Sequence, residues 1–216
     1  KLKKINIFLE NPNNSKFVIY NSVLNNLNIN MSSSAYKNDG LNYSNQIRHD
    51  EMLLTGCLNI LNSKFTKLKV NVENSSCEDA VNFIRSKGDI KNINVIHAKF
   101  DGIDADSSNI VFENINVQNA RNDCLDFSFG NYKIKKLMVK NCSDKGLSVG
   151  EKSKVDISEF NSINTNLSFV SKDNSVLTLN QFNSDIDDSS ICGKTYKKKQ
   201  EFDGAKLFLK QKINCK

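Results

Sequence analysis

Five aspartates in the middle of the chain are spaced so that they can act together. Asp79, Asp101 and Asp123 are each 22 residues apart, and Asp104 and Asp126 follow the second and third of them by three residues. If one such repeat stacks on the next, neighbouring carboxylates lie about 5 Å apart. At that distance carboxylates raise each other's pKa values, and they can share a hard cation such as Ca²⁺ or serve as a general acid and base.

Two kinds of partner would relieve the repulsion within this ladder. The first is a bound Ca²⁺ ion held by carboxylate oxygens alone. The second is a set of salt bridges to nearby bases, for which the candidates are Arg85, Arg121 and Lys145. A solvated ladder of turn carboxylates with no binding function is a third interpretation, and the residues alone leave the three open.

The element that must position these aspartates is a short strand that recurs every 22 residues. Its first apolar position is occupied in turn by Val81, Ile103, Leu125 and Leu147. Two residues later stand Phe83, Ala105, Phe127 and Val149, and between the two series lie Asn82, Asp104, Asp126 and Ser148. Apolar–polar–apolar alternation is typical of a half-buried strand, so the polar residues are expected to face outward.

A second alternating strand follows in each repeat. Its apolar positions are again 22 apart, in the series Ile93, Ile115, Leu137 and the series Val95, Val117, Val139, with a continuation expected near Phe160 and Phe182. A polar ladder comes next, formed by Asn74, His97, Asn119, Asn141, Ser162 and Ser184. The chain contains 33 asparagines, which suit tight turns and stacked polar ladders.

A unit of two short strands cannot bury its apolar face alone, but stacked units can. The sequence therefore predicts an all-β fold, a parallel β-solenoid with about 22 residues per coil. A leucine-rich repeat has a similar period, but it needs a leucine-bearing return segment where this chain has another alternating strand. We expect one domain, with irregular N-terminal coils or a cap at 1–52, regular coils at 53–190 and a basic C-terminal coil or cap at 191–216.

The repeats resemble the right-handed parallel β-helix proteins of the pectate-lyase-like type. The resemblance covers residues 53–205 and rests on successive coil motifs, among them Leu54-Thr55-Gly56, Cys77-Glu78-Asp79-Ala80, Asn122-Asp123-Cys124-Leu125 and Asp144-Lys145-Gly146-Leu147. Ser171-Lys172-Asp173 is similar to a later coil of a bacterial subgroup found in surface and secreted proteins. The resemblance implies a right-handed, single-stranded β-helix. It also implies a carbohydrate-related role, although the wider family includes members without catalysis.

The resemblance also implies roles for particular residues. In a polyuronate lyase of this type, carboxylates on an outer sheet face hold Ca²⁺, and an Arg or Lys removes the proton alpha to the substrate carboxylate. The metal ligands would then be Asp101, Asp104, Asp123 and Asp126, with Lys145 or Arg121 as the catalytic base. Substrate-binding residues would be Asn82, Asp104, Asp126, Ser148 and Arg85. A glycoside hydrolase would use two of the carboxylates as acid and base, but the polygalacturonase motifs are absent.

Charge and cysteine content set further bounds. The net charge is +6, and lysines gather near the C-terminus, but no nucleic-acid-binding module accompanies them, so no nucleic-acid partner is expected. No apolar run approaches the roughly 20 residues of a membrane span, so no membrane insertion is expected. The six cysteines form no CxxC pair. They permit disulfides, such as Cys192 with Cys215, or buried free thiols.

These observations lead to one functional hypothesis and one alternative. The hypothesis is a secreted or cell-surface β-helix that binds, and processes by lyase- or epimerase-like chemistry, an acidic polysaccharide along the Asp101–Asp126 face, with Ca²⁺ as cofactor. The alternative is a non-catalytic scaffold or interaction module, in a homo-oligomer or a larger surface assembly. An enzyme should gather its acids in one compact site, whereas a scaffold should have them evenly paired along the rod.

Overall fold

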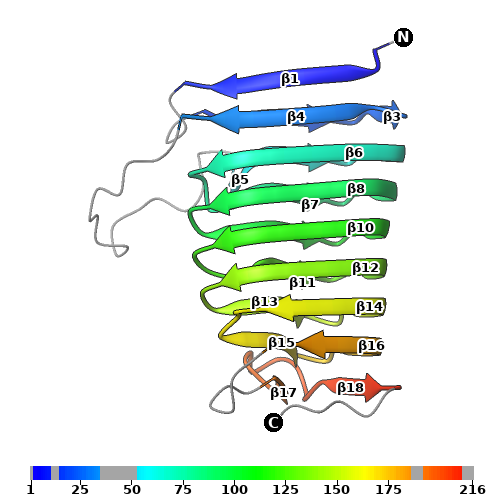
Figure 1. The fold of residues 1–216 in the computed structure, drawn as a ribbon. Coiled ribbons are helices and arrows are strands. Elements are labelled where there is room, and N and C mark those ends of the chain that lie inside the picture. Colours follow the sequence, from blue (N-terminus) through cyan, green and yellow to red (C-terminus); the bar gives the residue numbers. More distant parts are fainter. Residues whose placement is uncertain (1, 11–14, 35–52, 186–191, 211–216) are drawn as a thin grey trace.

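The structure is a computed structural model in which residues 2–10, 15–34, 53–185 and 192–210 are described. These residues contain strands and no helix, so none of them forms a helix able to cross a membrane. The parallel strands stack as a right-handed β-solenoid of about 7 turns, with roughly 23 residues per turn (Figure 1). The all-β, parallel β-helix prediction is therefore confirmed.

Two parallel sheets form the walls of the solenoid, and we call them sheet A and sheet B. Sheet A contains, in spatial order, β1 (Lys4–Leu9), β4 (Asn28–Ser33), β6 (Lys64–Ser75), β8 (Lys87–Ala98), β10 (Asn109–Ala120), β12 (Asn131–Cys142), β14 (Lys154–Ile163), β16 (Val176–Ser184) and β18 (Lys206–Leu209), with β3 (Val23–Asn25) also paired to β6. Sheet B contains β2 (Phe17–Tyr20), β5 (Gly56–Leu61), β7 (Asp79–Ile84), β9 (Asp101–Asp106), β11 (Leu125–Ser128), β13 (Lys145–Gly150), β15 (Leu167–Lys172) and β17 (Gly193–Tyr196). The described parts of both terminal regions thus extend the two sheets.

The core lies between the sheets and consists of the predicted apolar columns. In sheet B, Ile103 pairs with Val81 on one side and Leu125 on the other, and all three are fully buried. In sheet A, Ile115 pairs with Ile93 and Leu137. The aromatic rings stack along the axis. The ring of Phe127 lies 5.9 Å from that of Phe112 and 4.5 Å from that of Tyr132.

Each long strand of sheet A turns a corner near its middle. In β10 the buried residues are Ile110, Phe112, Ile115, Val117 and Ala120. At the corner, between Phe112 and Ile115, the spacing of inward residues changes from two to three. Two consecutive side chains therefore face outward at the corner, where simple alternation would place one. The same change of spacing occurs in β8, β12, β14 and β16.

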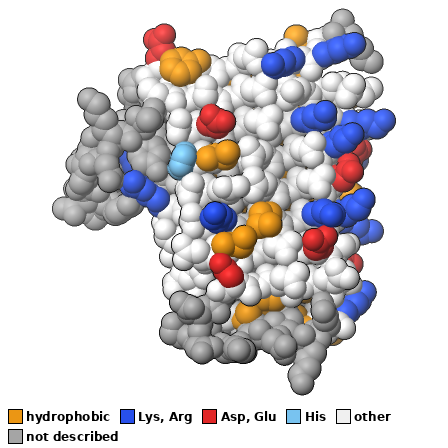
Figure 2. Space-filling model, in the orientation of Figure 1, with side chains coloured by type: hydrophobic (Ala, Val, Ile, Leu, Met, Phe, Trp, Pro, Cys, Tyr) orange, Lys and Arg blue, Asp and Glu red, His pale blue; other side chains and the backbone are white. Residues whose placement is uncertain are grey.

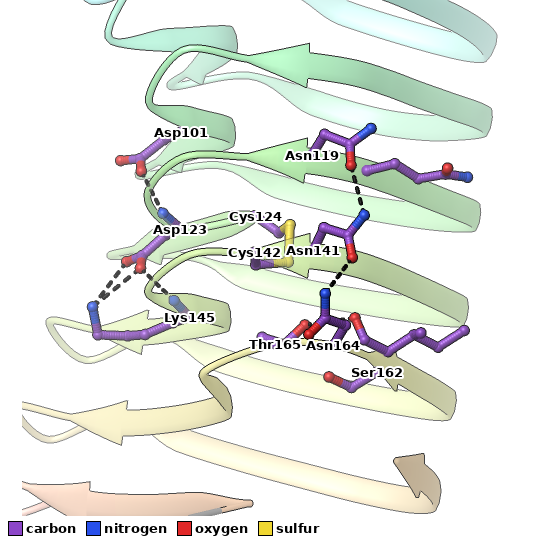
Figure 3. The surroundings of a disulfide bond; sticks show 12 residues. Asp101, Asn119, Asp123, Cys124, Asn141, Cys142, Lys145, Ser162, Asn164 and Thr165 are labelled. Carbon is purple, nitrogen blue, oxygen red and sulfur yellow. Dashed lines mark hydrogen bonds and ion pairs between the residues drawn. A yellow bond between two sulfur atoms is a disulfide. The ribbon is translucent and has the colours of Figure 1, made fainter. Parts of the chain in front are cut away.

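The turn that follows each long strand carries an asparagine ladder. The residues at this turn have left-handed backbone conformations and are Asn74, His97, Asn119, Asn141 and Asn164. Asparagine tolerates this conformation better than most residues. The Asn141 amide donates to Asn119 over 2.7 Å, and Asn164 donates to Asn141 over 2.7 Å (Figure 3). The polar ladder is confirmed as far as Asn141.

Beyond Asn141 the predicted ladder is wrong. Ser162 is buried and pairs with the core residue Val139, while the ladder continues at Asn164. Phe160 correspondingly pairs with Leu137, 23 residues earlier. The cause is one extra residue at the preceding turn, where both Glu151 and Lys152 are left-handed. The equivalent turns of the three coils before it have one left-handed residue each: Arg85, Ser107 and Phe129.

Two disulfides each join the region where a strand of sheet B begins to the region where the following strand of sheet A ends. Cys57 bonds to Cys77, and Cys124 bonds to Cys142, as Figure 3 shows for the second pair. Cys192 is also disulfide-bonded, and its predicted partner Cys215 lies outside the described residues. Because none of the described cysteines is free, the alternative of buried free thiols is wrong for them.

Removing the central disulfide is expected to destabilise the solenoid. The double substitution Cys124→Ser and Cys142→Ser opens a loop with a sequence separation of 18, which should lower the free energy of unfolding by about 3 kcal/mol. Thermal unfolding monitored by circular dichroism measures the change. A reducing agent should lower the midpoint of the wild type more than that of the variant, and an equal effect on both would contradict the assignment.

Candidate functional site

The aspartates gather on the outer face of sheet B. We call six of them the acidic cluster: Asp79, Asp101, Asp104, Asp106, Asp123 and Asp126. Strand pairing places Asp79 opposite Asp101 and Asp104 opposite both Asn82 and Asp126. Asp106 lies two residues beyond Asp104 on the same strand, β9. The predicted registers therefore bring the acids together on one face, within three neighbouring coils.

Asp101 and Asp123 hold the backbone of the coil that follows each of them. One oxygen of Asp101 accepts the N–H of Asp123 over 2.8 Å and the side-chain amide of Asn122 over 2.7 Å. Asp123 in turn accepts the N–H of Lys145 over 3.0 Å and its ammonium group over 3.1 Å (Figure 3). These carboxylates fix the turns that lead into β11 and β13, so their oxygens are already engaged.

Asn82, Asp104 and Asp126 form the second column and are less well satisfied. The side-chain amide of Asn82 donates to Thr55, to Asp79 over 3.1 Å and to Asp104 over 3.1 Å. The Oδ1 atom of Asn82 is buried without a hydrogen-bond partner, and so is Oδ1 of Asp126. A buried polar atom with no partner is costly, so these two oxygens mark a place where a donor or a cation would be stabilised.

A buried lysine approaches the cluster from its C-terminal side. Lys172 lies 4 % exposed, donates to Ser148 over 2.9 Å and places its ammonium 3.7 Å from Asp126. Gly150 leaves room for the Lys172 side chain, because a Cβ atom at position 150 would lie 2.7 Å from it. Lys172 therefore brings positive charge to the edge of the cluster, next to a carboxylate oxygen that still lacks a hydrogen bond.

Burial raises the pKa of every aspartate in the cluster. The pKa of Asp79 is raised to about 7, and the pKa values of Asp106 and Asp123 are raised to about 6. Burial, together with the neighbouring carboxylates, raises the pKa values of Asp101 and Asp104 well above the usual range. At Asp106 the charges of Asp126 and Glu151 add to the effect of burial.

Glu151 borders the cluster but is stabilised as an anion. Burial alone would raise its pKa, but hydrogen bonds from Lys199 and Ser128 hold the pKa of Glu151 below its usual value. The Lys199 ammonium lies 2.7 Å from the Glu151 carboxylate. Lys199 thus neutralises the negative charge of Glu151 at the edge of the cluster, whereas the carboxyl group of Asp104 at its centre has other carboxyl groups as its charged neighbours.

The three predicted bases lie in different surroundings. Lys145 is ion-paired with Asp123 and Asp144. Burial alone would lower the pKa of its ammonium, but these partners hold it above the ordinary value. This opposes a role for Lys145 as a base at neutral pH. The guanidinium of Arg85 donates to Asn62 over 3.0 Å, on the turn after β7. Arg121 is half-buried in the turn between β10 and Asp123.

Three charged residues of this face were missed by the sequence analysis. Asp106 and Lys172 belong to the same outward column, which runs with a period of 22 through Ser128 and Gly150. The repeat therefore contained the signal for both. Glu151 lies at the turn that carries the extra residue, where the period fails, and no spacing signal places it beside Ser128.

The donor chemistry and the geometry give different indications about a metal. All the candidate ligands carry oxygen, which is the donor that Ca²⁺ prefers. Within the described part of the chain, however, no three Asp, Glu, His or Cys side chains are arranged as a group that could hold a metal ion.

Comparison with known proteins adds no relative. No family model matches this chain, and neither a curated protein nor a solved structure matches it significantly.

Proposed function

We propose that the protein is a carbohydrate-binding β-solenoid and that the centre of the acidic cluster is its polysaccharide-binding site. The site comprises Asn82, Asp104, Asp106 and Asp126. The observation that carries the proposal is the pair of buried, unpartnered oxygens on Asn82 and Asp126, on either side of Asp104. Sugar hydroxyl groups donate hydrogen bonds, so a glycan that displaced the side chains covering these oxygens would satisfy both of them.

An acidic polysaccharide at this site would require the negative charge to be neutralised. Protons do this in part, because the pKa values of the aspartates are raised by burial. A divalent cation such as Ca²⁺ would do it more completely, with Asp104 and Asp126 as the ligands and Asn82 as a neutral oxygen donor. Asp101 and Asp123, also predicted as ligands, each use one oxygen to accept a backbone N–H group, so they would contribute through the other oxygen. Bound Ca²⁺ would neutralise a substrate carboxylate.

The carboxyl groups of Asp104 and Asp106, two residues apart on β9 and with raised pKa values, support the proposal that the site also processes its ligand. A carboxyl group next to a carboxylate can donate one proton and accept another, which is the requirement for acid–base chemistry. In the lyase- or epimerase-like version, Arg121 remains the candidate base, since Lys145 is held in ion pairs. Ser148 is bonded to Lys172, and this pair would contact the ligand beside Asp126.

Calcium is expected to stabilise the protein at pH 8. Millimolar Ca²⁺ at about 100 times its dissociation constant adds about 2.7 kcal/mol to the free energy of unfolding, which is about 5 to 10 °C in the thermal midpoint. The increase should disappear at pH 5, where protons compete for the same carboxylates. It should also disappear when Asp104→Asn and Asp126→Asn are combined.

The control for this experiment is Asp203→Asn, which removes one exposed carboxylate outside the cluster. This variant should keep the full response to Ca²⁺. A response that survives in the Asp104 and Asp126 double variant would refute the cation site. Binding of polysaccharides to the same variants, with ultraviolet absorbance recorded for unsaturated uronate, tests binding and turnover separately.

The alternative is that the solenoid is a non-catalytic scaffold or interaction module within a homo-oligomer or larger surface assembly. The two continuous sheets and the asparagine ladder favour it, since they would form a stiff rod. Evenly paired acids along the rod would favour it further, but the acids gather in one cluster with raised pKa values. Unchanged binding of every polysaccharide by the Asp104 and Asp126 double variant would favour the scaffold.

The disulfides support the proposed location of the protein. Disulfides persist in oxidising surroundings and are rare in reducing ones. The described cysteines are all disulfide-bonded, so we infer that the protein is secreted or displayed at a cell surface. The proposed relationship to pectate-lyase-like β-helices of bacterial surface proteins is consistent with that location.

A further inference from the structure

A second feature that could bind a ligand lies on the outer face of sheet A, far from the acidic cluster. A groove with a volume of about 590 Å³ runs beside the corners of strands β8 to β14. Four lysines line it: Lys67, Lys91, Lys133 and Lys135. Figure 2 shows lysines and arginines gathered along the side of the molecule where the long strands of sheet A begin.

The excess of positive charge belongs to a longer stripe that includes the groove. In the first six residues of the sheet A strands β6 to β16 and in β18, the lysines are Lys64, Lys67, Lys69, Lys87, Lys91, Lys133, Lys135, Lys136, Lys154 and Lys206, while the acids are Asp89, Glu113, Asp156 and Glu159. These ten lysines and four acids leave a surplus of six positive charges, as large as the net charge of +6 of the whole chain. Strand pairing aligns Lys87 with Lys64 in adjacent coils.

The amines of the groove are not neutralised by the acids beside them. No carboxylate of the described residues lies within ion-pair distance of Lys67, Lys91, Lys133 or Lys135. Two of the three acids that line the groove have other partners. Asp89 accepts the backbone N–H of Lys67 over 2.6 Å, and Asp156 accepts the amide of Asn180 over 2.9 Å. The lysines are therefore available to an anion from outside the chain.

The shape and lining of the groove select among polyanions. Successive coils lie about 4.8 Å apart, so amines recur along the rod, as the charges of an extended linear polymer do. No exposed aromatic ring lines the groove, since Phe112 is buried, and stacking of nucleic-acid bases on aromatic rings is therefore excluded. Val111 is 51 % exposed at its centre, and it offers an apolar contact to the face of a sugar ring.

We propose that this groove binds an acidic polysaccharide chain along the solenoid axis, without turnover. The groove is independent of the proposed site on sheet B, because its lysines and that site's aspartates lie on different sheets of the solenoid (Figure 1). If both sites operate, the groove anchors the polymer and the acidic cluster acts on a separate part of it. If the acidic cluster binds nothing, the groove still binds.

The test compares two double variants with the same change in net charge. Lys133→Glu with Lys135→Glu should weaken the binding of polygalacturonate and heparin at least tenfold, as measured by fluorescence anisotropy at about 0.1 M salt. Lys197→Glu with Lys198→Glu, on the exposed C-terminal segment outside the groove, should change it less than twofold. Asp203→Asn, which alters neither site, should bind in this assay as the wild type does. The fold-loss caused by the Lys133 and Lys135 substitutions should be the same with and without Asp104→Asn and Asp126→Asn, which separates this proposal from the function proposed for sheet B.

Several outcomes would overturn the proposal. Equal weakening in both lysine variants would mean that net charge alone attracts the polymer. Tighter binding of single-stranded poly-dT than of either polysaccharide would make the groove a nucleic-acid site. Absence of binding to both polysaccharides would leave the groove without a ligand of this class. Because the substituted lysines are exposed, both variants should fold, and circular dichroism checks that they do.

Discussion

Lowering the pH from 8 to 5 is expected to raise the thermal midpoint of the protein by roughly 10 °C. The pKa of Asp79 is about 7 in the folded protein, and those of Asp106 and Asp123 are about 6, whereas the ordinary value is 3.8. Between about pH 4 and pH 7 the folded chain therefore binds more protons than the unfolded chain. Its stability is greatest below this range and is lost as the pH rises through 6 to 7.

The size of the effect follows from the size of the pKa shifts. One pKa unit corresponds to about 1.4 kcal/mol. The raised pKa of Asp79 alone therefore lowers the free energy of unfolding by on the order of 4 kcal/mol when the pH rises from below 4 to above 7. Glu151 acts in the opposite direction. Its pKa is lowered, and the stability that it contributes is lost as the pH falls below its usual value of 4.5. The two effects together place the maximum of stability at about pH 4.5 or just below it, where Glu151 begins to lose its charge.

Asp104→Asn tests the cause of this pH dependence. The substitution removes a buried charge but keeps the shape, so it should raise the midpoint at pH 8 and flatten its dependence on pH. The exposed Asp203→Asn is the matched control and should leave the profile unchanged. A midpoint that stays constant or rises between pH 5 and pH 8 in the wild type would refute the clustered, buried carboxyl groups. Thermal unfolding in a series of buffers provides the measurement.

Phe127→Ala is expected to lower the free energy of unfolding by about 4 kcal/mol. The ring of Phe127 is fully buried and stacks between Phe112 and Tyr132, so its removal leaves a cavity and interrupts the aromatic stack. The rigid sheets on either side limit how far the cavity can collapse. Chemical unfolding in urea, followed by circular dichroism, measures the loss.

Phe129→Ala is the matched control for this substitution. Phe129 is 47 % exposed and has an edge contact with Phe202. Its replacement should cost less than about 1 kcal/mol, because little apolar surface leaves its buried environment. If the two variants lost equal stability, the stack of Phe112, Phe127 and Tyr132 would not be a main source of the stability of the solenoid.

The fold was predictable because one sequence signal was repeated many times. Val81, Ile103, Leu125 and Leu147 occupy the same position in successive coils, and each repetition strengthens the assignment of strand and register. The disulfides were not predictable in this way. Cys124 and Cys142 meet because the strands between them, β11 and β12, make up most of one coil, and their separation of 18 residues matches no period of the chain.

The candidate site was predictable in position but not in chemistry. The columns placed Asp104 beside Asp126, as the spacing indicated. Whether those carboxylates are hydrated or buried depends on what surrounds them, and a period contains no information about that. The ion pairs of Lys145 likewise depend on side-chain reach, so its unsuitability as a base became clear only from its contacts with Asp123 and Asp144.

The extra residue at Glu151 and Lys152 has a consequence for how such a chain evolves. The insertion is absorbed at a turn, and the interior columns stay in phase on both sides of it. A gene encoding this solenoid can therefore gain or lose whole coils by duplication or deletion, because every coil offers the same backbone pairing to the next. The outward-facing positions are then free to diverge in sequence. A new binding surface can arise by point substitution on a stacked backbone that is already stable.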